Sequence, residues 1–202
     1  MPCKHRVVGS IPIRSTKTFN MTFGILTINH RRPQVLNLFL ASMKRLRQDI
    51  GINFPVVCVS GVEDRKMCAQ YGVHHIVQAN RPASMKWDTG MSFLQKLNLD
   101  YVLVLGSDDI MSTDLLRAYM TEMEKDVDLI GLNEIYVYDG DGNTKGALRR
   151  YTSSRVLGVG KMLNKRILDK VEWRGWVSSH PRSWGMDGLL ARNTDKHIRT
   201  KS

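Results

Sequence analysis

Residues 101–109 decide the fold, and they are Tyr101-Val102-Leu103-Val104-Leu105-Gly106-Ser107-Asp108-Asp109. The first five are apolar without interruption, which predicts a strand buried on both faces, as in the middle of a parallel sheet. Two carboxylates then follow side by side. Adjacent carboxylates repel each other, and a divalent cation that also binds phosphate oxygens would stabilise them. The sequence therefore predicts a metal and phosphate site at the end of this strand.

The two acids could instead serve the next helix, because carboxylates are favoured at a helix N-terminus. That helix is expected over residues 113–125, and Ser112, Thr113 and Asp114 already stand at its start. Asp108 and Asp109 are therefore left for a ligand, and we favour the ligand-binding interpretation.

Strands and helices alternate on the N-terminal side of this stretch. Runs of β-branched and apolar residues predict strands over residues 21–28, 54–59 and 73–77. Apolar residues at helical spacing predict helices over residues 35–50, 63–70 and 83–97. The alternation predicts an α/β fold, with a mostly parallel, Rossmann-like sheet and helices on both faces. Ligands bind beyond the carboxyl ends of such strands, so the residues that follow each strand are the site candidates.

The C-terminal half is expected to be less regular. Strands are expected over residues 128–138 and 156–160, and a hairpin turn over 139–143. Helices are expected over residues 165–170 and 183–193. Without repeats or an interior linker, the sequence predicts one domain over residues 1–202, with a basic N-terminal segment 1–20 and a polar tail 194–202.

Charge is unevenly spread along the 202 residues, whose net charge is +11. Residues 1–50 carry nine Lys or Arg and one acid, residues 51–144 carry seven and fourteen, and residues 145–202 carry fourteen and four. Basic flanks suit nucleic acid, an anionic membrane or a phosphorylated substrate, and they also promote solubility. Because both flanks agree in sign, we expect a polyanionic partner.

The sequence predicts neither a membrane protein nor a secreted one. No apolar run reaches the roughly 18 residues of a membrane span, and the first residues are too polar for a secretory signal. The three cysteines, Cys3, Cys58 and Cys68, are odd in number and match no zinc motif. We therefore expect a cytoplasmic protein with no transmembrane segment and with reduced cysteines that have no special role.

Polar residues also follow or end other expected strands. Thr27, Asn29 and Arg31 lie at the end of the first strand, where polar groups and backbone amides can hold a nucleotide. The alternative there is an ordinary loop with an Asn turn. Lys86 and Asp88 lie near the start of the helix 83–97, where a capped helix with a buried Trp is an equal alternative.

A last group of candidates lies near the C-terminus. Asp187, between two glycines, could take the proton from an acceptor hydroxyl, or it could cap a helix. Aromatic rings could line an acceptor site or belong to the core, and each histidine could bind a metal or lie at the surface. The acceptor candidates are Trp176, His180 and Trp184, and the candidates for a third metal ligand are His180 and His197.

Taken in order, these segments resemble the GT-A glycosyltransferases of the family 2 type. Residues 26–31 are similar to that family's Pro-Thr-x-Asn-Arg segment, and residues 84–90 to its Ser-x-x-Arg-Asn-x-Gly segment. Residues 103–109 look like its strand ending in Asp-x-Asp-Asp, which holds the metal and the donor diphosphate. Asp187 falls where the family has its base. The resemblance covers residues 21–192.

The sequence departs from that family at five places. Leu26 replaces the proline of the first segment, and Trp87 and Asp88 replace the Arg and Asn of the second. Gly106 stands where the first Asp of the metal motif is usual. Val59-Ser60-Gly61 replaces the Asp-Asp-Gly that contacts the uracil base, which leaves Ser60, Glu63 or Asp64 for that contact, and Met186 replaces the Glu beside Asp187.

The resemblance implies a metal-dependent transfer of a sugar from a nucleotide diphosphate sugar, expected to be a UDP-sugar, to an acceptor hydroxyl. Asp187 would be the base, and Asp109 assisted by Asp108 would hold Mn²⁺ or Mg²⁺. The implied donor-binding residues are Thr27, Asn29, Arg31, Ser60, Lys86, Asp88 and Asp108. Whether the anomeric centre is inverted or retained depends on how close Asp187 lies to it.

The basic flanks bear on the acceptor, which is expected to be a hydroxylated base in DNA, as for phage enzymes of this kind. A surface polysaccharide or lipopolysaccharide is the alternative acceptor. Two other classes of function stay open. A nucleotidyltransferase would use a similar sheet, but no glycine-rich lysine loop follows the first strand. A non-catalytic nucleic-acid-binding α/β module would explain the charge but not the acidic strand end.

Overall fold

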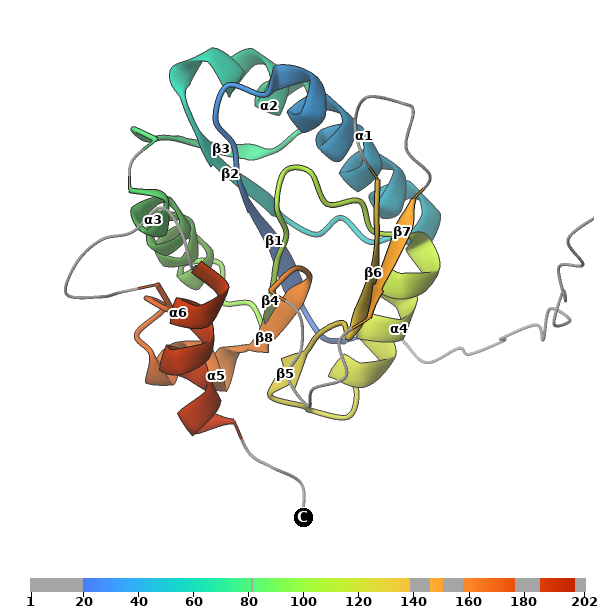
Figure 1. Cartoon of the computed structure of the whole chain (residues 1–202), viewed down its shortest axis with the longest axis vertical. Coiled ribbons are helices and arrows are strands. Elements are labelled where there is room, and N and C mark those ends of the chain that lie inside the picture. The colour runs from blue at the N-terminus through green and yellow to red at the C-terminus, as the bar shows by residue number, and fades with distance from the viewer. Residues whose placement is uncertain (1–19, 81, 139–145, 151–157, 177–185, 199–202) are drawn as a thin grey trace, which may run out of the picture.

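The computed structural model describes residues 20–80, 82–138, 146–150, 158–176 and 186–198, the side chains of residues 186 and 187 excepted. A central sheet has the strand order β3-β2-β1-β4-β8-β5 (Figure 1). β1 (Phe23–Ile28), β2 (Val56–Ser60), β3 (His74–Val77) and β4 (Tyr101–Val104) run parallel. β8 (Lys161–Asn164) runs antiparallel to β4 on one side and to β5 (Leu129–Ile130) on the other. The prediction of an α/β fold with a mostly parallel sheet is confirmed.

Helices cover both faces of the sheet (Figure 1). One face is covered by α1 (Pro33–Ile50), α2 (Arg65–Gln70) and α4 (Thr113–Met123), and the short 3-10 turn η1 (Val62–Asp64) precedes α2. The other face is covered by α3 (Ala83–Gln95), α5 (Lys165–Lys170) and α6 (Met186–Thr194), which η2 (Asp195–His197) follows. The six helices of the described part correspond to the six that the sequence predicts.

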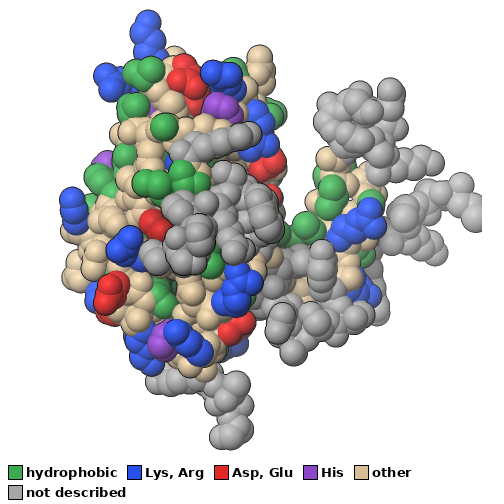
Figure 2. All heavy atoms as spheres, turned by 60° about the vertical axis from the view of Figure 1, so that its left-hand side comes forward, with side chains coloured by type: hydrophobic (Ala, Val, Ile, Leu, Met, Phe, Trp, Pro, Cys, Tyr) green, Lys and Arg blue, Asp and Glu red, His purple; other side chains and the backbone are tan. Residues whose placement is uncertain are grey.

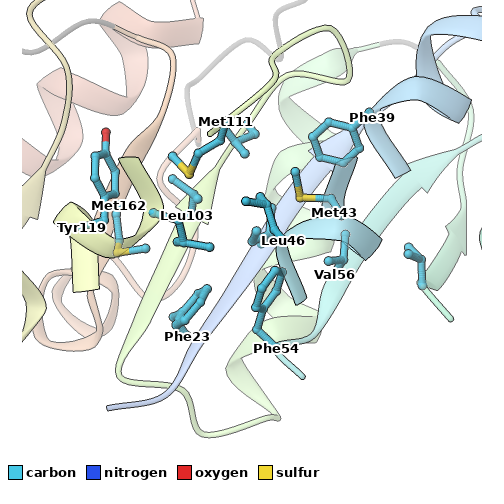
Figure 3. Packing of buried hydrophobic residues seen from close by; sticks show 14 of the residues in the cluster. Phe23, Phe39, Met43, Leu46, Phe54, Val56, Leu103, Met111, Tyr119 and Met162 are labelled. Carbon is cyan, nitrogen blue, oxygen red and sulfur yellow. The ribbon is translucent and has the colours of Figure 1, made fainter. Parts of the chain in front are cut away.

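The first core lies under α1 and α4 (Figure 3). α1 begins with Pro33 in its first turn and ends at Gly51, whose φ of 70° is left-handed, a conformation that glycine adopts without strain. Phe23 and Phe54 stack in this core with ring centroids 4.9 Å apart. The apolar stripe of α1 faces the sheet and consists of Leu36, Phe39, Leu40, Met43 and Leu46.

The second core lies under α3, α5 and α6, and it depends on a close helix–strand approach. A Cβ at Gly90 of α3 would lie 2.2 Å from Leu26 Cδ1 and 3.1 Å from Val59 Cγ2. Since Leu26 is fully buried, its methyl group has little room to move. Gly90, one of the residues shared with the family 2 segment, therefore has a packing role in this fold.

Two strand predictions in the C-terminal half are wrong. Residues 128–138 do not form one strand, because the chain leaves the main sheet after Ile130 and starts β6 (Glu134–Val137) in a separate two-stranded ribbon with β7 (Ala147–Arg150). Residues 158–160 form a bend and turn, with Gly160 at φ 69°, and the strand expected at 156–160 begins only at Lys161. Residues 156 and 157 and the expected turn 139–143 lie outside the described residues.

The β6–β7 ribbon is a surface feature. Each of its described residues is exposed except the half-buried Ile135, and Tyr136, Val137 and Leu148 are among the exposed apolar side chains. Over the described part of the chain, no helix is both long enough and apolar enough to cross a membrane.

Candidate active site

The site candidates of β1 and β4 meet because these two strands are neighbours in the sheet. Leu26 pairs with Val104, and the Leu105 amide donates to the Leu26 carbonyl at 3.0 Å. The loop after β1 therefore lies against the loop after β4. Arg32 joins them: its Nη1 donates to Asp108 Oδ2 at 2.8 Å and its Nη2 to Ser107 Oγ at 2.9 Å.

Both carboxylates of the acidic strand end turn toward Gly106. A Cβ at Gly106 would lie 2.8 Å from Asp108 Oδ1 and 2.8 Å from Asp109 Oδ2. The Gly106 amide itself donates to Asp109 Oδ2 at 2.7 Å. Gly106 stands where the family 2 metal motif usually has its first acid. Because glycine has no side chain, one oxygen of Asp108 and one of Asp109 lie beside it in the space that a side chain would fill.

Behind the carboxylates, Asn29 is the centre of a buried polar network. Its Nδ2 donates to Asp64 Oδ2 at 2.8 Å, and its Oδ1 accepts from Ser107 Oγ at 3.3 Å. Its carbonyl accepts from Lys86 Nζ at 2.7 Å. All four residues are at most 3% exposed, and buried polar groups are costly unless they are hydrogen-bonded. The network therefore fixes the ends of β1, β4, η1 and α3 relative to one another.

Lys86 is placed inside this network. Its Nζ also donates to Asn80 Oδ1 at 3.4 Å. Burial lowers the pKa of Lys86, while the charge of Asp64 acts in the opposite direction. The residue expected to hold a diphosphate is only 1% exposed, and its described contacts position the end of β1.

Ser60 and Thr27 lie deeper than a contact with a nucleotide base requires. Both are fully buried. Ser60 Oγ lies 2.9 Å from His75 Nε2 on β3, and burial lowers the pKa of that histidine. Thr27 Oγ1 finds no hydrogen-bond partner among the described residues. Of the other two base-contact candidates, which follow β2, Asp64 accepts the hydrogen bond from Asn29 and Glu63 is exposed.

Asp88 and Trp176 contact each other at the start of α3. Asp88 Oδ1 accepts from the Trp176 amide at 3.0 Å, and the Trp176 ring stacks on Trp87 with centroids 5.3 Å apart. Burial raises the pKa of Asp88, and the hydrogen bond from Trp176 partly offsets this. The Trp176 ring is 2% exposed, so in this arrangement it packs in the second core.

Asp108 and Asp109 are the two acids at this strand end that could hold a divalent cation. Within the described ranges, no group of three or more His, Cys, Asp or Glu side chains is arranged to hold a metal ion. Two carboxylates suffice when substrate phosphates complete the shell, as Mg²⁺ sites often show. The convergence of both carboxylates on Gly106 therefore fits a cation shared with a diphosphate.

Several candidates lie apart from this cluster or cannot be placed. Arg31 is exposed and has a left-handed φ of 50°. Asp187 falls in the first turn of α6, but its side chain is outside the described residues, as are His180 and Trp184 altogether. His197 lies half-buried in η2. Cys58 and Cys68 are buried free thiols.

Sequence reasoning missed Arg32, Ser107 and Asn80 as members of the cluster. Arg32 and Ser107 lie within the two strand-end segments that the parallel-sheet rule points to, so that rule finds the segments but not the individual residues. Arg32 reaches Asp108, whereas the adjacent Arg31 has a left-handed backbone and an exposed side chain, and no sequence signal distinguishes the two arginines. Asn80 follows β3, and no sequence signal marks it.

Comparison with known proteins bears on the fold. No protein-family model and no curated protein matches the sequence. Among solved structures, S. aureus TarS superposes with a TM-score of 0.65 at 13% identity, over 86% of this chain and 33% of that one. Residues 1–349 of TarS in complex with UDP give a TM-score of 0.59 at 13% identity, over 86% of this chain and 55% of that one. The chain thus spans about a third of TarS and about half of that segment.

A second kind of neighbour is matched along most of its length. The 4-diphosphocytidyl-2C-methyl-D-erythritol synthase from Anaerococcus prevotii superposes with a TM-score of 0.56 at 11% identity, over 90% of this chain and 86% of that one. At these identities the similarity establishes the fold. The chain has the Rossmann-like sheet that occurs in GT-A glycosyltransferases and in nucleotidyltransferases.

Proposed function

We propose that this protein is a glycosyltransferase that uses a nucleotide diphosphate sugar, expected to be a UDP-sugar, and binds the donor diphosphate at Asp108 and Asp109. The observation that carries the proposal is the convergence of both carboxylates on Gly106 at the end of β4. This is the edge of an open α/β sheet at which ligands bind. The buried network behind it holds the two loops in place, as a preorganised site requires.

Asp108 and Asp109 are the residues that would hold Mn²⁺ or Mg²⁺, which when bound would neutralise charge on the leaving diphosphate. The hydrogen bonds of Asn29 and Lys86 fix the start of the loop after β1, and Arg31 and Arg32 of that loop are proposed to contact the donor. Asp187, in the first turn of α6, is proposed as the base that takes the proton from the acceptor hydroxyl. A direct displacement with that base would invert the anomeric centre.

For the acceptor we propose a hydroxylated base in DNA. The excess of fourteen Lys or Arg over four acids in residues 145–202 supports a polyanion. On the face that Figure 2 shows, Lys and Arg side chains are scattered among acidic and other side chains and do not form one patch. Tyr136 in β6 and Tyr138 just after it are exposed, and they offer aromatic groups of the kind that nucleic acids bind.

A nucleotidyltransferase is the second candidate, because the Anaerococcus prevotii synthase is matched over 86% of its length. The length and composition of the loop after β1 disfavour a nucleotidyltransferase. Only Asn29–Arg32 separate β1 from α1, and none of these residues is glycine, so few backbone amides are available to wrap a triphosphate.

The product distinguishes the two candidates. Nucleotide sugars and nucleoside triphosphates would be incubated in turn with the protein and Mn²⁺ or Mg²⁺, with and without hydroxymethylated DNA. A glycosyltransferase releases nucleoside diphosphate, and a nucleotidyltransferase releases pyrophosphate. Release of neither, from folded protein under all combinations, contradicts both assignments and leaves a binding module. Release of nucleoside diphosphate that requires added polysaccharide or lipopolysaccharide in place of DNA points instead to that acceptor.

Substitution of Asp109 tests the site itself. Asp109→Asn removes one of two carboxylate charges and should lower nucleoside diphosphate release on the order of 100-fold or more, as loss of an electrostatic group at a reacting centre does. Asp114→Asn is the matched control, because that acid is 94% exposed on α4 and should leave the rate unchanged. Equal rates for all three proteins would contradict the assignment of the site.

A further inference from the structure

Arg32 is a cation held directly on the acidic strand end. Its guanidinium bonds Asp108 Oδ2 at 2.8 Å and Ser107 Oγ at 2.9 Å through different nitrogens. The residue occupies the N-cap position of α1, where its side chain makes no cap bond. Its side chain is therefore engaged by the site and not by the helix it precedes.

Asp108 offers its two oxygens to two different neighbours. Oδ2 accepts from Arg32, whereas Oδ1 is the oxygen that faces the space beside Gly106, together with Asp109 Oδ2. Two adjacent carboxylates repel each other, and Arg32 offsets part of that repulsion. A divalent cation between the carboxylates would offset it too, and two cations on one carboxylate would repel each other. Arg32 and such a cation therefore oppose each other's binding at Asp108.

We propose that Arg32 is the exchangeable counter-charge of this site. It neutralises Asp108 until a divalent cation replaces it there, and the released guanidinium then binds the donor diphosphate. The inference rests on the proposed function, which supplies the diphosphate. A guanidinium suits both positions, because its planar donors match carboxylate and phosphate alike.

The exchange requires an ion pair that is weak enough to break. The side chains of Arg32 and Asp108 are 46% and 59% exposed, and exposed pairs of this kind change an affinity by a factor of about five or less. The bond to phosphate that replaces this pair is charge-assisted as well, and a divalent cation bound at Asp108 would remove the attraction of that carboxylate for Arg32. The balance therefore favours release of Arg32 once metal and diphosphate are both bound.

Titration calorimetry on the full chain tests the exchange in two arms. The first arm titrates Mn²⁺ alone. Arg32→Ala should bind Mn²⁺ about two- to fivefold more tightly than the unsubstituted protein, because the competing cation is gone. The second arm titrates UDP in saturating Mn²⁺, with GDP, CDP and ADP in parallel. There Arg32→Ala should bind the nucleotide about tenfold more weakly, because a charge-assisted bond is lost.

Two further variants test whether the affinity changes arise from the Arg32–Asp108 contact. Lys44→Ala removes the same charge from the exposed side of α1 and should change neither affinity. Asp108→Asn combined with Arg32→Ala should lose the tighter Mn²⁺ binding, because the contested carboxylate is gone. Thermal unfolding midpoints would establish that each variant is folded.

Opposite changes in the two affinities support the exchange. Weakening of both, or no change in either, while the unsubstituted protein binds a nucleoside diphosphate, would overturn it and leave the proposed function standing. Failure of the unsubstituted protein to bind any of the four nucleotides overturns the proposed function, and the role of Arg32 in diphosphate binding with it.

Discussion

Gly90 is the residue at which α3 comes nearest to the sheet, and it shows how a shared motif can have a packing cause. An added methyl group would stand 2.2 Å from a methyl of the fully buried Leu26. The helix can cross β1 and β2 at this distance only with glycine there. The close approach also sets the position of Lys86, one turn earlier in the same helix, and of Asp88, two residues earlier.

Gly90→Ala should lower the free energy of unfolding by about 1–3 kcal/mol, the usual cost of overpacking a core. The gain in helix propensity, at most about 1 kcal/mol, offsets only part of this cost. Gly188→Ala in α6 is the control, because among the described residues an added Cβ there meets only the end of the Arg192 side chain, at 4.0 Å. That variant should be unchanged or slightly more stable. Urea unfolding of both variants measures the difference, and equal stability of the two would contradict the close approach.

Asp88 is a half-buried acid with a raised pKa, and its effect on stability depends on pH. Its folded pKa lies above the ordinary value of 3.8 because of burial. The folded state therefore binds the proton more tightly than the unfolded state. Stability falls as the pH rises from about the unfolded pKa through the folded pKa, and it levels off above that.

Asp88→Asn removes this dependence and keeps an oxygen that accepts from the Trp176 amide. It should be more stable than the unsubstituted protein at neutral pH, and the difference should shrink on acidification toward pH 4. Asp88→Ala removes the acceptor as well and should lose about 1–2 kcal/mol at every pH. Urea unfolding across the pH range measures these differences. A constant gap between the Asn variant and the unsubstituted protein would contradict the raised pKa.

At the scale of elements, Arg166, in the first turn of α5 directly after β8, ties α5 to the chain before β5. Its Nη1 bonds Asp126 Oδ1 at 2.5 Å and its Nε bonds Asp128 Oδ1, and the Asp128 side chain is 3% exposed. A buried carboxylate without its cation is costly. The short strand β5, with only Leu129 and Ile130, is therefore held in the sheet by charge as well as by its ladder.

Arg166→Met should destabilise the protein by about 3 kcal/mol or more, the cost of leaving a buried charge uncompensated. Amide exchange at Leu129 and Ile130 should quicken more than in β1. Lys165→Met is the matched control, since Lys165 forms an exposed pair with Asp169 and its loss should cost less than about 1 kcal/mol. Equal effects of the two substitutions would mean that the Arg166 contacts contribute little.

The sequence predicts the four parallel strands because each contains an apolar or β-branched run, and it fails where strands are short or polar at their ends. β8 begins with Lys161 and ends with Asn164, yet all four of its residues are buried, so neither alternation nor an apolar run marks it. β5 is too short to separate from β6 by composition. After Ile130 the chain leaves the main sheet for the β6–β7 ribbon, and this depends on tertiary packing, which hydrophobic periodicity does not predict.

The sequence predicts which segments form the site, but not which residues of those segments contact one another. The rule that ligands lie beyond strand ends leads to Asn29 and to Asp108 and Asp109. It does not reveal that Lys86, which is distant in sequence and lies on α3, reaches the Asn29 carbonyl, or that Ser60 is fully buried. Those facts depend on how deeply α3 packs and on which face of β2 each residue occupies.

At the scale of the whole molecule, the net charge of +11 predicts salt-dependent binding to DNA. Affinity for plain duplex DNA should fall linearly on logarithmic axes as salt rises, with a slope near 0.9 for each phosphate contacted. Fluorescence anisotropy across a salt series measures this slope. Asp109→Asn should leave both affinity and slope unchanged, because the strand end is proposed to bind the donor. Absence of binding at low salt would contradict the DNA acceptor.

The strand order also determines when the sheet can be completed. As the chain is synthesised, β2, β3 and β4 each emerge beside a strand that is already present, since their neighbours are β1, β2 and β1. β5 has no such partner, because β8 lies between it and β4. The outer edge of β4 therefore stays unpaired while residues 105–160 are made, and an unpaired edge invites pairing with other chains. That edge belongs to the strand that carries the acidic loop, so a ribosome that pauses before residue 164 leaves that strand open to pairing with other chains.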